Sequence, residues 1–177
     1  NISPDTFIEP TDYTDEMTNF LLTQNVSVDN MLVKDVDTSQ LQHFGATLTP
    51  NGQFFTLSRK GFLAQMMEDM YNDRTTYKKK AIEAKKQIEK ESDTGKRQEL
   101  ENLAARYNNL QLAKKVCLNS AYGALGSEYF RFFDVRQAAA VTTAGQLAIQ
   151  WIEKKLNGYL DKLLGTNKDY VIASDTD

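Results

Sequence analysis

Two aspartates stand two residues apart at the end of the sequence, in Asp175-Thr176-Asp177. Residues two apart in an extended chain project to the same side, so both carboxylates can face one point in space. Carboxylate oxygens are ligands that Mg²⁺ prefers, often together with substrate phosphates at sites of phosphoryl transfer. The spacing is therefore compatible with a magnesium site on Asp175 and Asp177, although Asp-x-Asp pairs are also common in surface turns.

A second set of residues, Lys115, Asn119 and Tyr122, is spaced by four and by three residues. In a helix this spacing places all three on one face, and that face points away from the apolar stripe that would pack against a partner helix. A lysine is a point cation for a triphosphate, and a tyrosine ring beside Gly123 offers a flat surface that a base can approach closely. An ordinary solvated helix face has the same pattern.

A third set consists of Arg74 and Lys78, which are four residues apart. Counting around a helix aligns both cations with the apolar residues Leu63, Met67 and Ala81, so they interrupt the apolar stripe. Charges directed inward are costly unless an anion meets them, and a nucleotide phosphate would serve. A salt bridge to an acidic neighbour, or a lysine stem that extends its charge to water, is the alternative.

The elements that must position these residues are mostly helices. Apolar periodicity predicts helices over about 61–90, 96–122 and 138–164, with Gly165 as the stop of the third. The first two are joined by a short turn and should form an antiparallel hairpin, packed along Leu103, Leu110, Cys117 and Ala121 of the second helix. Turn residues between 46–49 and 54–57 predict a β-hairpin, and the apolar run 170–173 predicts a buried strand. Residues 1–45 are interpreted as connecting structure.

Composition narrows the class of protein. One cysteine and one histidine leave no internal disulfide and no zinc finger. The apolar runs are too short for a membrane span, and we expect a soluble intracellular protein. The net charge is −3, but basic residues outnumber acidic ones between 60 and 115. This asymmetry fits contact with a polyanion, and a Lys/Glu-rich surface helix gives the same count.

Taken together, the motifs resemble those of the family B DNA polymerases. Lys115 followed by Asn119-Ser120-Ala121-Tyr122-Gly123 resembles the fingers motif of that family, and Ser174-Asp175-Thr176-Asp177 resembles a palm motif. Between them, 141–146 resembles the start of a palm helix. The stretch 122–153 is especially similar to the replicative polymerases of T-even-like bacteriophages, and the motif order agrees over nearly the whole chain.

The resemblance implies a role for each residue. Arg74, Lys78 and Lys115 would bind the incoming triphosphate, with Lys115 counted among the catalytic residues. Asn119 would line the same pocket, and Tyr122 and Gly123 would lie near the nascent base pair. Asp177 would be the catalytic metal-binding aspartate, and Asp175 its supporting carboxylate. The implied reaction is attack of a primer 3′-hydroxyl on the α-phosphate of a dNTP, assisted by two Mg²⁺ ions.

The resemblance also implies an architecture and partners. We expect a mostly helical α+β fold, with an antiparallel helical hairpin (the fingers) and an incomplete palm with short β-strands. The expected divisions are 1–59, a palm-associated segment with the β-hairpin; 60–122, the fingers; and 123–177, a palm segment ending in the metal motif. Primer–template DNA and dNTP are the implied partners, and a sliding clamp is left open for the full-length protein.

The chain is therefore expected to be a piece of a viral replication enzyme that acts in the cytoplasm of an infected bacterial cell. The other catalytic aspartate would precede Asn1, so the chain alone is expected to be inactive. Two other interpretations stay open at this point. One is a non-enzymatic helical module that binds nucleic acid through its basic middle segment. The other is a dimerising helical hairpin in which Arg74 and Lys78 form salt bridges across an interface.

Overall fold

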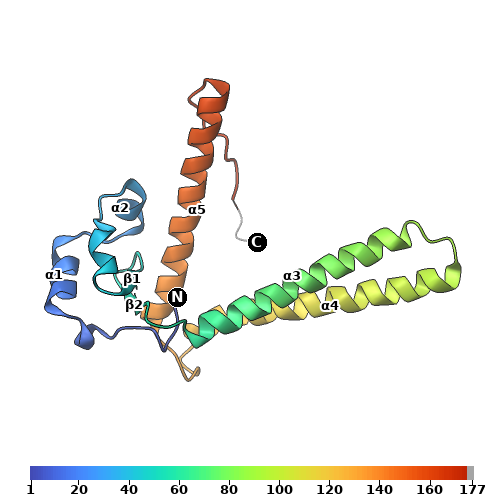
Figure 1. Cartoon of the computed structure of the whole chain (residues 1–177), viewed down its shortest axis with the longest axis horizontal. Coiled ribbons are helices and arrows are strands. Elements are labelled where there is room, and N and C mark those ends of the chain that lie inside the picture. The colour runs from blue at the N-terminus through green and yellow to red at the C-terminus, as the bar shows by residue number, and fades with distance from the viewer. Residues whose placement is uncertain (175–177) are drawn as a thin grey trace. The chain divides into compact units, whose positions relative to one another are not determined.

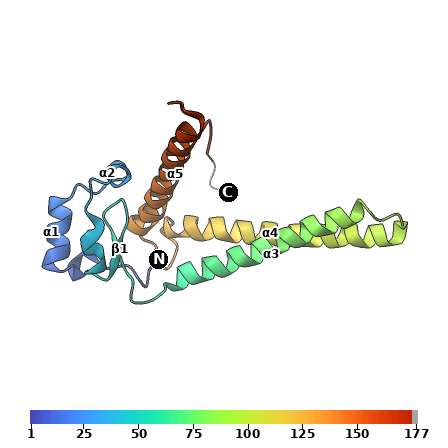
Figure 2. The ribbon, with the colours of Figure 1, turned by 45° about the horizontal axis from the view of Figure 1, so that its top comes forward.

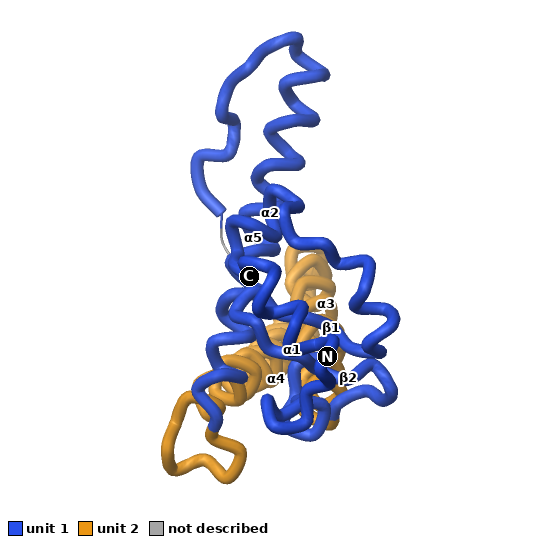
Figure 3. The backbone as a smooth tube through the Cα atoms, turned by 90° about the vertical axis from the view of Figure 1, so that its left-hand side faces the viewer, with its two compact units in different colours: residues 1–61, 134–177 blue, residues 62–133 orange. Residues whose placement is uncertain are grey.

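The structure, a computed structural model, describes residues 1–174. The chain divides into two compact units: residues 1–61 together with the segment that starts at 134, and residues 62–133 (Figure 3). Three long helices, four short helical segments and one small antiparallel sheet make up the regular secondary structure of the described residues. The expected fold class, α+β and mostly helical, is confirmed.

The first unit begins with four short helical segments. They are the 3₁₀ helix η1 (Pro10–Asp12), α1 (Asp15–Thr23), α2 (Val28–Val33) and the 3₁₀ helix η2 (Thr38–Gln42). Thr14 and Ser27 cap α1 and α2, because each hydroxyl accepts a hydrogen bond from a backbone N–H three residues later, at 3.2 Å. Serine and threonine at these positions therefore fix where the two helices start.

The β-hairpin is confirmed, with β1 (Ala46–Leu48) paired to β2 (Phe54–Thr56) so that Ala46 lies opposite Thr56. Gly52 in the turn has φ of 77°, a conformation that side chains other than glycine rarely adopt. The Asn51 side chain donates from Nδ2 to the carbonyl of Arg136 at 2.9 Å. The turn is thereby fixed to a residue far along the chain.

Phe54 is the centre of the core in this unit and is fully buried. Its ring meets those of Tyr13, Phe20 and Phe44 edge-on, with centroids 5.2, 6.3 and 6.0 Å away. Tyr13, Phe20 and Phe44 all come from the first 45 residues. The interpretation of that segment as connecting structure is therefore wrong: its spaced aromatic residues supply much of the core, a role that its polar average composition conceals.

The first residues of the chain are bound to the end of the same unit. Asn1 donates from Nδ2 to the carbonyls of Thr56 (2.8 Å) and Arg59 (2.7 Å), and its Oδ1 accepts from the Gly61 N–H at 2.7 Å. A Cβ at Gly61 would lie 2.3 Å from the Cβ of Ser3, which is fully buried. Glycine is therefore required where these two backbone segments cross.

The second unit is an antiparallel hairpin of two long helices, α3 (Phe62–Ile88) and α4 (Thr94–Leu125), as predicted (Figure 1). The short connection ends at Asp93, whose side chain accepts from the Lys96 N–H at 2.9 Å and so caps α4. Seen from a second direction, the two helices again run side by side (Figure 2).

The packed face of α4 differs from the predicted one. Cys117 is exposed and Leu103 is 37% exposed, whereas Ala104 is buried on α4, facing buried Ala81 and Ala84 of α3. The apolar line through Leu103 and the apolar line through Ala104 are offset by one residue, which corresponds to a rotation of about 100° around the helix axis. The small alanines let the two backbones approach closely, so their line packs and the Leu103 line stays at the edge.

The third long helix, α5 (Val135–Leu164), belongs to the first unit. It starts slightly before the predicted position, because Asp134 caps it by accepting from the Arg136 N–H at 2.8 Å. Gly165 ends it in the left-handed conformation, with φ of 65°, as predicted.

The segment 170–173 is not a strand, and the prediction of a buried strand there is wrong. Ile172 is 99% exposed. Instead of pairing with a strand, the Tyr170 and Val171 N–H groups donate to Oδ1 of Asn157 on α5, at 3.0 and 3.2 Å. A strand needs a neighbour for its backbone hydrogen bonds, and none of the described strands pairs with this segment.

Candidate nucleotide-binding site on the helical hairpin

The residues that the sequence singles out on 62–133 all lie on α3 and α4. A salt bridge between Lys114 Nζ and Asp73 Oδ2, 2.7 Å long, connects the two helices. Arg74 and Lys115 each follow one of these paired residues, so the fold brings them to the same level of the hairpin. Residue spacing describes each helix by itself, so the sequence did not predict this alignment between the two helices.

A stacked pair of tyrosine rings aligns the two helices at a second level, nearer to the turn of the hairpin. Tyr77 of α3 and Tyr107 of α4 have ring centroids 6.3 Å apart and lie nearly parallel. Lys80 lies over the Tyr107 ring at 5.6 Å. Lys78 is therefore next to the middle of α4, where it borders a hollow of about 190 Å³ that is also lined by Lys85, Asn108 and Gln111.

Arg74 is half-buried and faces the partner helix, as the sequence predicts. Its Nε is buried and has no hydrogen-bond partner among the described residues. A buried donor left unsatisfied costs about 1–3 kcal/mol. The guanidinium is thus held where an incoming anion would supply the missing acceptor. The acidic residue next to Arg74 in the sequence, Asp73, pairs with Lys114.

Lys78 does not point inward, and that prediction is wrong. Its side chain is exposed, because a position four residues after Arg74 is turned by about 40° and lies at the edge of the packed face. The inward-facing cation on α3 is Arg74, and Lys78 is solvated.

The stripe of α4 also differs partly from its prediction. Asn119 and Tyr122 are exposed, but Lys115 is half-buried. The stripe therefore lies along the edge of the packed face and not on the far side of the helix. Because α3 and α4 are antiparallel, Asn119 and Tyr122 lie toward the start of α3, away from Lys78. The candidate residues form a row along the hairpin.

Gly123 is exposed and lies within α4 near the end of the row. A Cβ added there would meet nothing within 4 Å. Glycine inside a helix is less stable than alanine by about 0.5–1 kcal/mol. Packing within the chain therefore gives no reason for glycine at this position, and a ligand that approaches the backbone closely would give one.

The Lys114–Asp73 pair has the electrostatics of a partly solvated contact. The hydrogen bond to Asp73 raises the pKa of Lys114 above its ordinary value. The two side chains are 33% and 53% exposed. The sequence alone does not indicate that this pair is part of the site, because its members are 41 residues apart and no local pattern connects them.

Asp175 and Asp177 lie outside the described residues. Within 1–174, no group of three or more His, Cys, Asp or Glu side chains is arranged to hold a metal ion. In that same part of the chain, no helix combines the length and apolarity that crossing a membrane requires.

Comparison with known proteins identifies the class of protein. Residues 12–176 match the family described as DNA polymerase family B. The chain belongs to this family.

Individual relatives agree with the family match. The DNA-directed DNA polymerase of Enterobacteria phage T4 is 49% identical over 81 residues, which cover 45% of this chain and 9% of that protein. The corresponding enzyme of Escherichia phage RB69 is 50% identical over 68 residues, covering 38% of this chain and 8% of the relative. The DNA polymerase delta catalytic subunit of Candida albicans is 33% identical over 134 residues, which cover 74% of this chain and 12% of that protein. The chain thus spans only a small part of the length of these proteins.

Proposed function

We propose that this chain is the fingers and part of the palm of a DNA-directed DNA polymerase that replicates viral DNA in a bacterial cell. Membership of family B and the similarity to two phage polymerases support this proposal. In it, 60–122 are the fingers, and 1–59 and 123–177 are palm segments. The observation that carries the proposal is the alignment of Arg74 with Lys115 across one helical hairpin, fixed by the adjacent Lys114–Asp73 pair.

The substrates in this proposal are a dNTP and primer–template DNA. Arg74, Lys78 and Lys115 bind the triphosphate, and the unsatisfied Nε of Arg74 gains an acceptor there. Asn119 lines the same pocket. The exposed ring of Tyr122 and the open surface at Gly123 lie beside the nascent base pair. These side chains contribute by orienting the phosphates and neutralising charge, which is how catalysis by positioning and electrostatics operates.

The metal site of the proposal consists of Asp175 and Asp177. Two carboxylates are a fitting donor set for Mg²⁺, which prefers oxygen ligands and completes its shell with water and substrate phosphate. Two such ions, when bound, would stabilise the attacking and leaving oxygens of the transfer. The helix α5 carries the chain toward these aspartates, and Asn157 holds the returning segment at Tyr170 and Val171.

Substitutions in the complete polymerase test the proposal. Asp177→Ala should abolish primer extension. Lys115→Ala should lower kcat/KM for dNTP about 10- to 100-fold, because a hydrogen bond to a charged group contributes about 1.5–3 kcal/mol. Lys90→Ala removes an exposed cation near the turn of the same hairpin and should leave dNTP use unchanged. Intact synthesis by the Asp177→Ala enzyme would instead favour a non-enzymatic nucleic-acid-binding module.

A further inference from the structure

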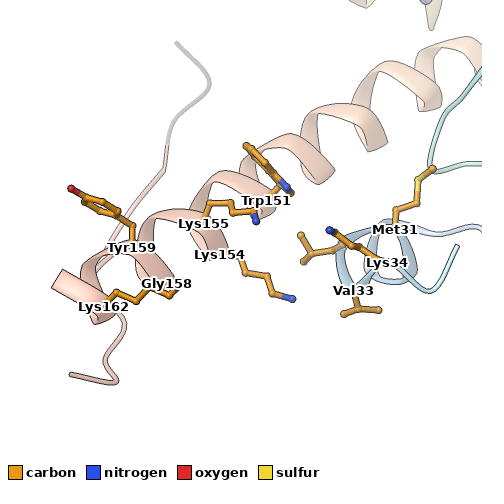
Figure 4. Close-up of a pocket in the computed structure, with 10 residues that line it drawn as sticks. Met31, Val33, Lys34, Trp151, Lys154, Lys155, Gly158, Tyr159 and Lys162 are labelled. Carbon is orange, nitrogen blue, oxygen red and sulfur yellow. The ribbon is translucent and has the colours of Figure 1, made fainter. Parts of the chain in front are cut away.

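A groove of about 520 Å³ lies between α2 and α5 in the first unit, and none of its lining residues belongs to the proposed nucleotide site (Figure 4). One side is formed by 31–34 at the end of α2, and the other by the part of α5 between Trp151 and Lys162. The proposed synthesis reaction gives none of these residues a role.

The groove is strongly basic. Four of its ten lining residues are lysines and none is acidic: Lys34, Lys154, Lys155 and Lys162. Within residues 1–174 none of the four forms a salt bridge. The neighbouring acid Asp161 is engaged elsewhere, since its Oδ1 accepts from the Lys168 N–H at 2.9 Å. The lysines therefore present positive charge that no salt bridge among the described residues neutralises, and a polyanion is the complementary ligand.

The same groove exposes two large aromatic rings. Trp151 is 51% exposed and Tyr159 is 62% exposed. They are eight residues apart on α5, which corresponds to about 12 Å along the helix axis. Lys155 lies over the Trp151 ring at 5.7 Å. An apolar hollow of about 460 Å³ adjoins the groove and shares Met31 and Trp151 with it. Rings and cations thus alternate along one surface.

We propose that this groove binds single-stranded DNA. Lysines that follow the phosphate backbone, together with rings on which unpaired bases stack, are the combination by which proteins hold single strands. A duplex would satisfy the lysines but keep its bases paired, leaving Trp151 and Tyr159 without a stacking partner. The proposal goes beyond synthesis at the hairpin site and does not depend on it.

The chain carries its own reporter for this site, because Trp151 is its one tryptophan. Titrating the chain with unlabelled oligo(dT) should quench tryptophan fluorescence. Affinity should fall with salt. Replacing Lys154, Lys155 and Lys162 by alanine should reduce the log–log salt slope by about 2, since each phosphate contact on a single strand contributes about 0.7. Tyr159→Ala should weaken binding about tenfold, the scale of one lost base–aromatic stack.

A matched triple variant provides the control. Replacing Lys85, Lys86 and Lys90 by alanine removes the same charge from exposed positions of the hairpin and should leave the quenching curve unchanged. Circular dichroism should verify that each variant keeps its helices. For a variant that loses helicity, Lys154→Gln alone should still lower the salt slope.

Three results would overturn the proposal. They are absence of quenching, equal quenching by the folded α5 triple variant, and preferential quenching by duplex DNA, by oligo(U) or by anionic phosphatidylserine vesicles. Failure of this proposal is distinguishable from failure of the proposed synthesis function. Asp177→Ala should leave the quenching intact, and the α5 substitutions should leave dNTP use intact.

Discussion

Lys114 and Asp73 form a 2.7 Å salt bridge that sets two candidate phosphate-binding residues, Arg74 and Lys115, at one level of the helical hairpin. The paired residues are 41 positions apart in the sequence. Each is the immediate neighbour of a candidate residue, so the alignment of the site depends on the register of the two helices.

The salt bridge gives a prediction for high pH. The hydrogen bond from Lys114 to Asp73 raises the pKa of Lys114. The stabilisation by this salt bridge is therefore complete below the ordinary lysine pKa of 10.5 and is lost as pH rises through the higher pKa of the folded state. Asp73→Asn should therefore destabilise the hairpin slightly at neutral pH, with a difference that shrinks above pH 10.5. Urea unfolding of both proteins across this range measures it. A difference that grows with pH would contradict the assignment.

Replacing Gly123 by alanine should have opposite effects on the stability of α4 and on nucleotide incorporation. Gly123→Ala should stabilise α4 by about 0.5–1 kcal/mol, because a Cβ there meets no atom and alanine is the better helix former. The same change should impair nucleotide incorporation in the complete enzyme, because the methyl group would occupy ligand space. Thermal unfolding and single-nucleotide extension provide the two readouts.

A second helical glycine serves as the control for this experiment. Gly145 in α5 also has nothing within 4 Å of an added Cβ. Gly145→Ala should stabilise its helix to a similar extent and leave incorporation unchanged. Unimpaired incorporation by Gly123→Ala would remove the argument for a ligand at that position.

Phe54 should be the most sensitive position in the first unit. Phe54→Ala should lower the free energy of unfolding by about 3–5 kcal/mol, because it leaves a cavity among three edge-on rings. Phe133, which is 42% exposed, should tolerate alanine within about 0.5 kcal/mol. Unfolding in guanidinium chloride measures the loss of stability for both variants. Equal losses of unfolding free energy for Phe54→Ala and Phe133→Ala would argue against a core centred on Phe54.

Asp134 gives a prediction for low pH. Burial raises the pKa of this carboxyl, but hydrogen bonds from the side chain and backbone of Arg136 outweigh it, and the net pKa is lowered. Its stabilisation is therefore present above the ordinary value of 3.8 and is lost as pH falls through the lower folded value. Asp134→Asn keeps an N-cap but not the charge, so it should reduce stability at neutral pH and remove part of the acid sensitivity.

The measurement for Asp134 is acid unfolding followed by far-UV circular dichroism. The expected loss is below about 1 kcal/mol, because the Arg136 and Asp134 side chains are partly solvated, at 42% and 14% exposed. Asp134→Ala should cost about 1 kcal/mol more through the lost cap. Identical acid midpoints for Asp134→Asn and the unmodified chain would exclude a role for the charge.

Some features of the fold follow directly from local sequence. The three long helices, the β-hairpin and the stop at Gly165 match their predictions, because periodicity, caps and turn residues act over a few neighbouring positions. The strand at 170–173 did not form, since its apolar run says nothing about whether a neighbouring strand is present. The N-terminal core was missed because its rings are spread through a polar segment.

The sequence by itself determined the three long helices and the β-hairpin. It also determined the spacing of Lys115 four residues before Asn119, and the resemblance to family B polymerases. The tertiary structure alone decided that Arg74 faces inward while Lys78 is solvated, and that Ala104 packs in place of Leu103. It also decided that Lys34, which follows α2, lines one groove with lysines of α5. Each of these depends on contacts between residues far apart in the chain, such as Asp73 with Lys114 on the hairpin. Local spacing fixes the direction of a side chain around its own helix, but only packing decides what that side chain meets.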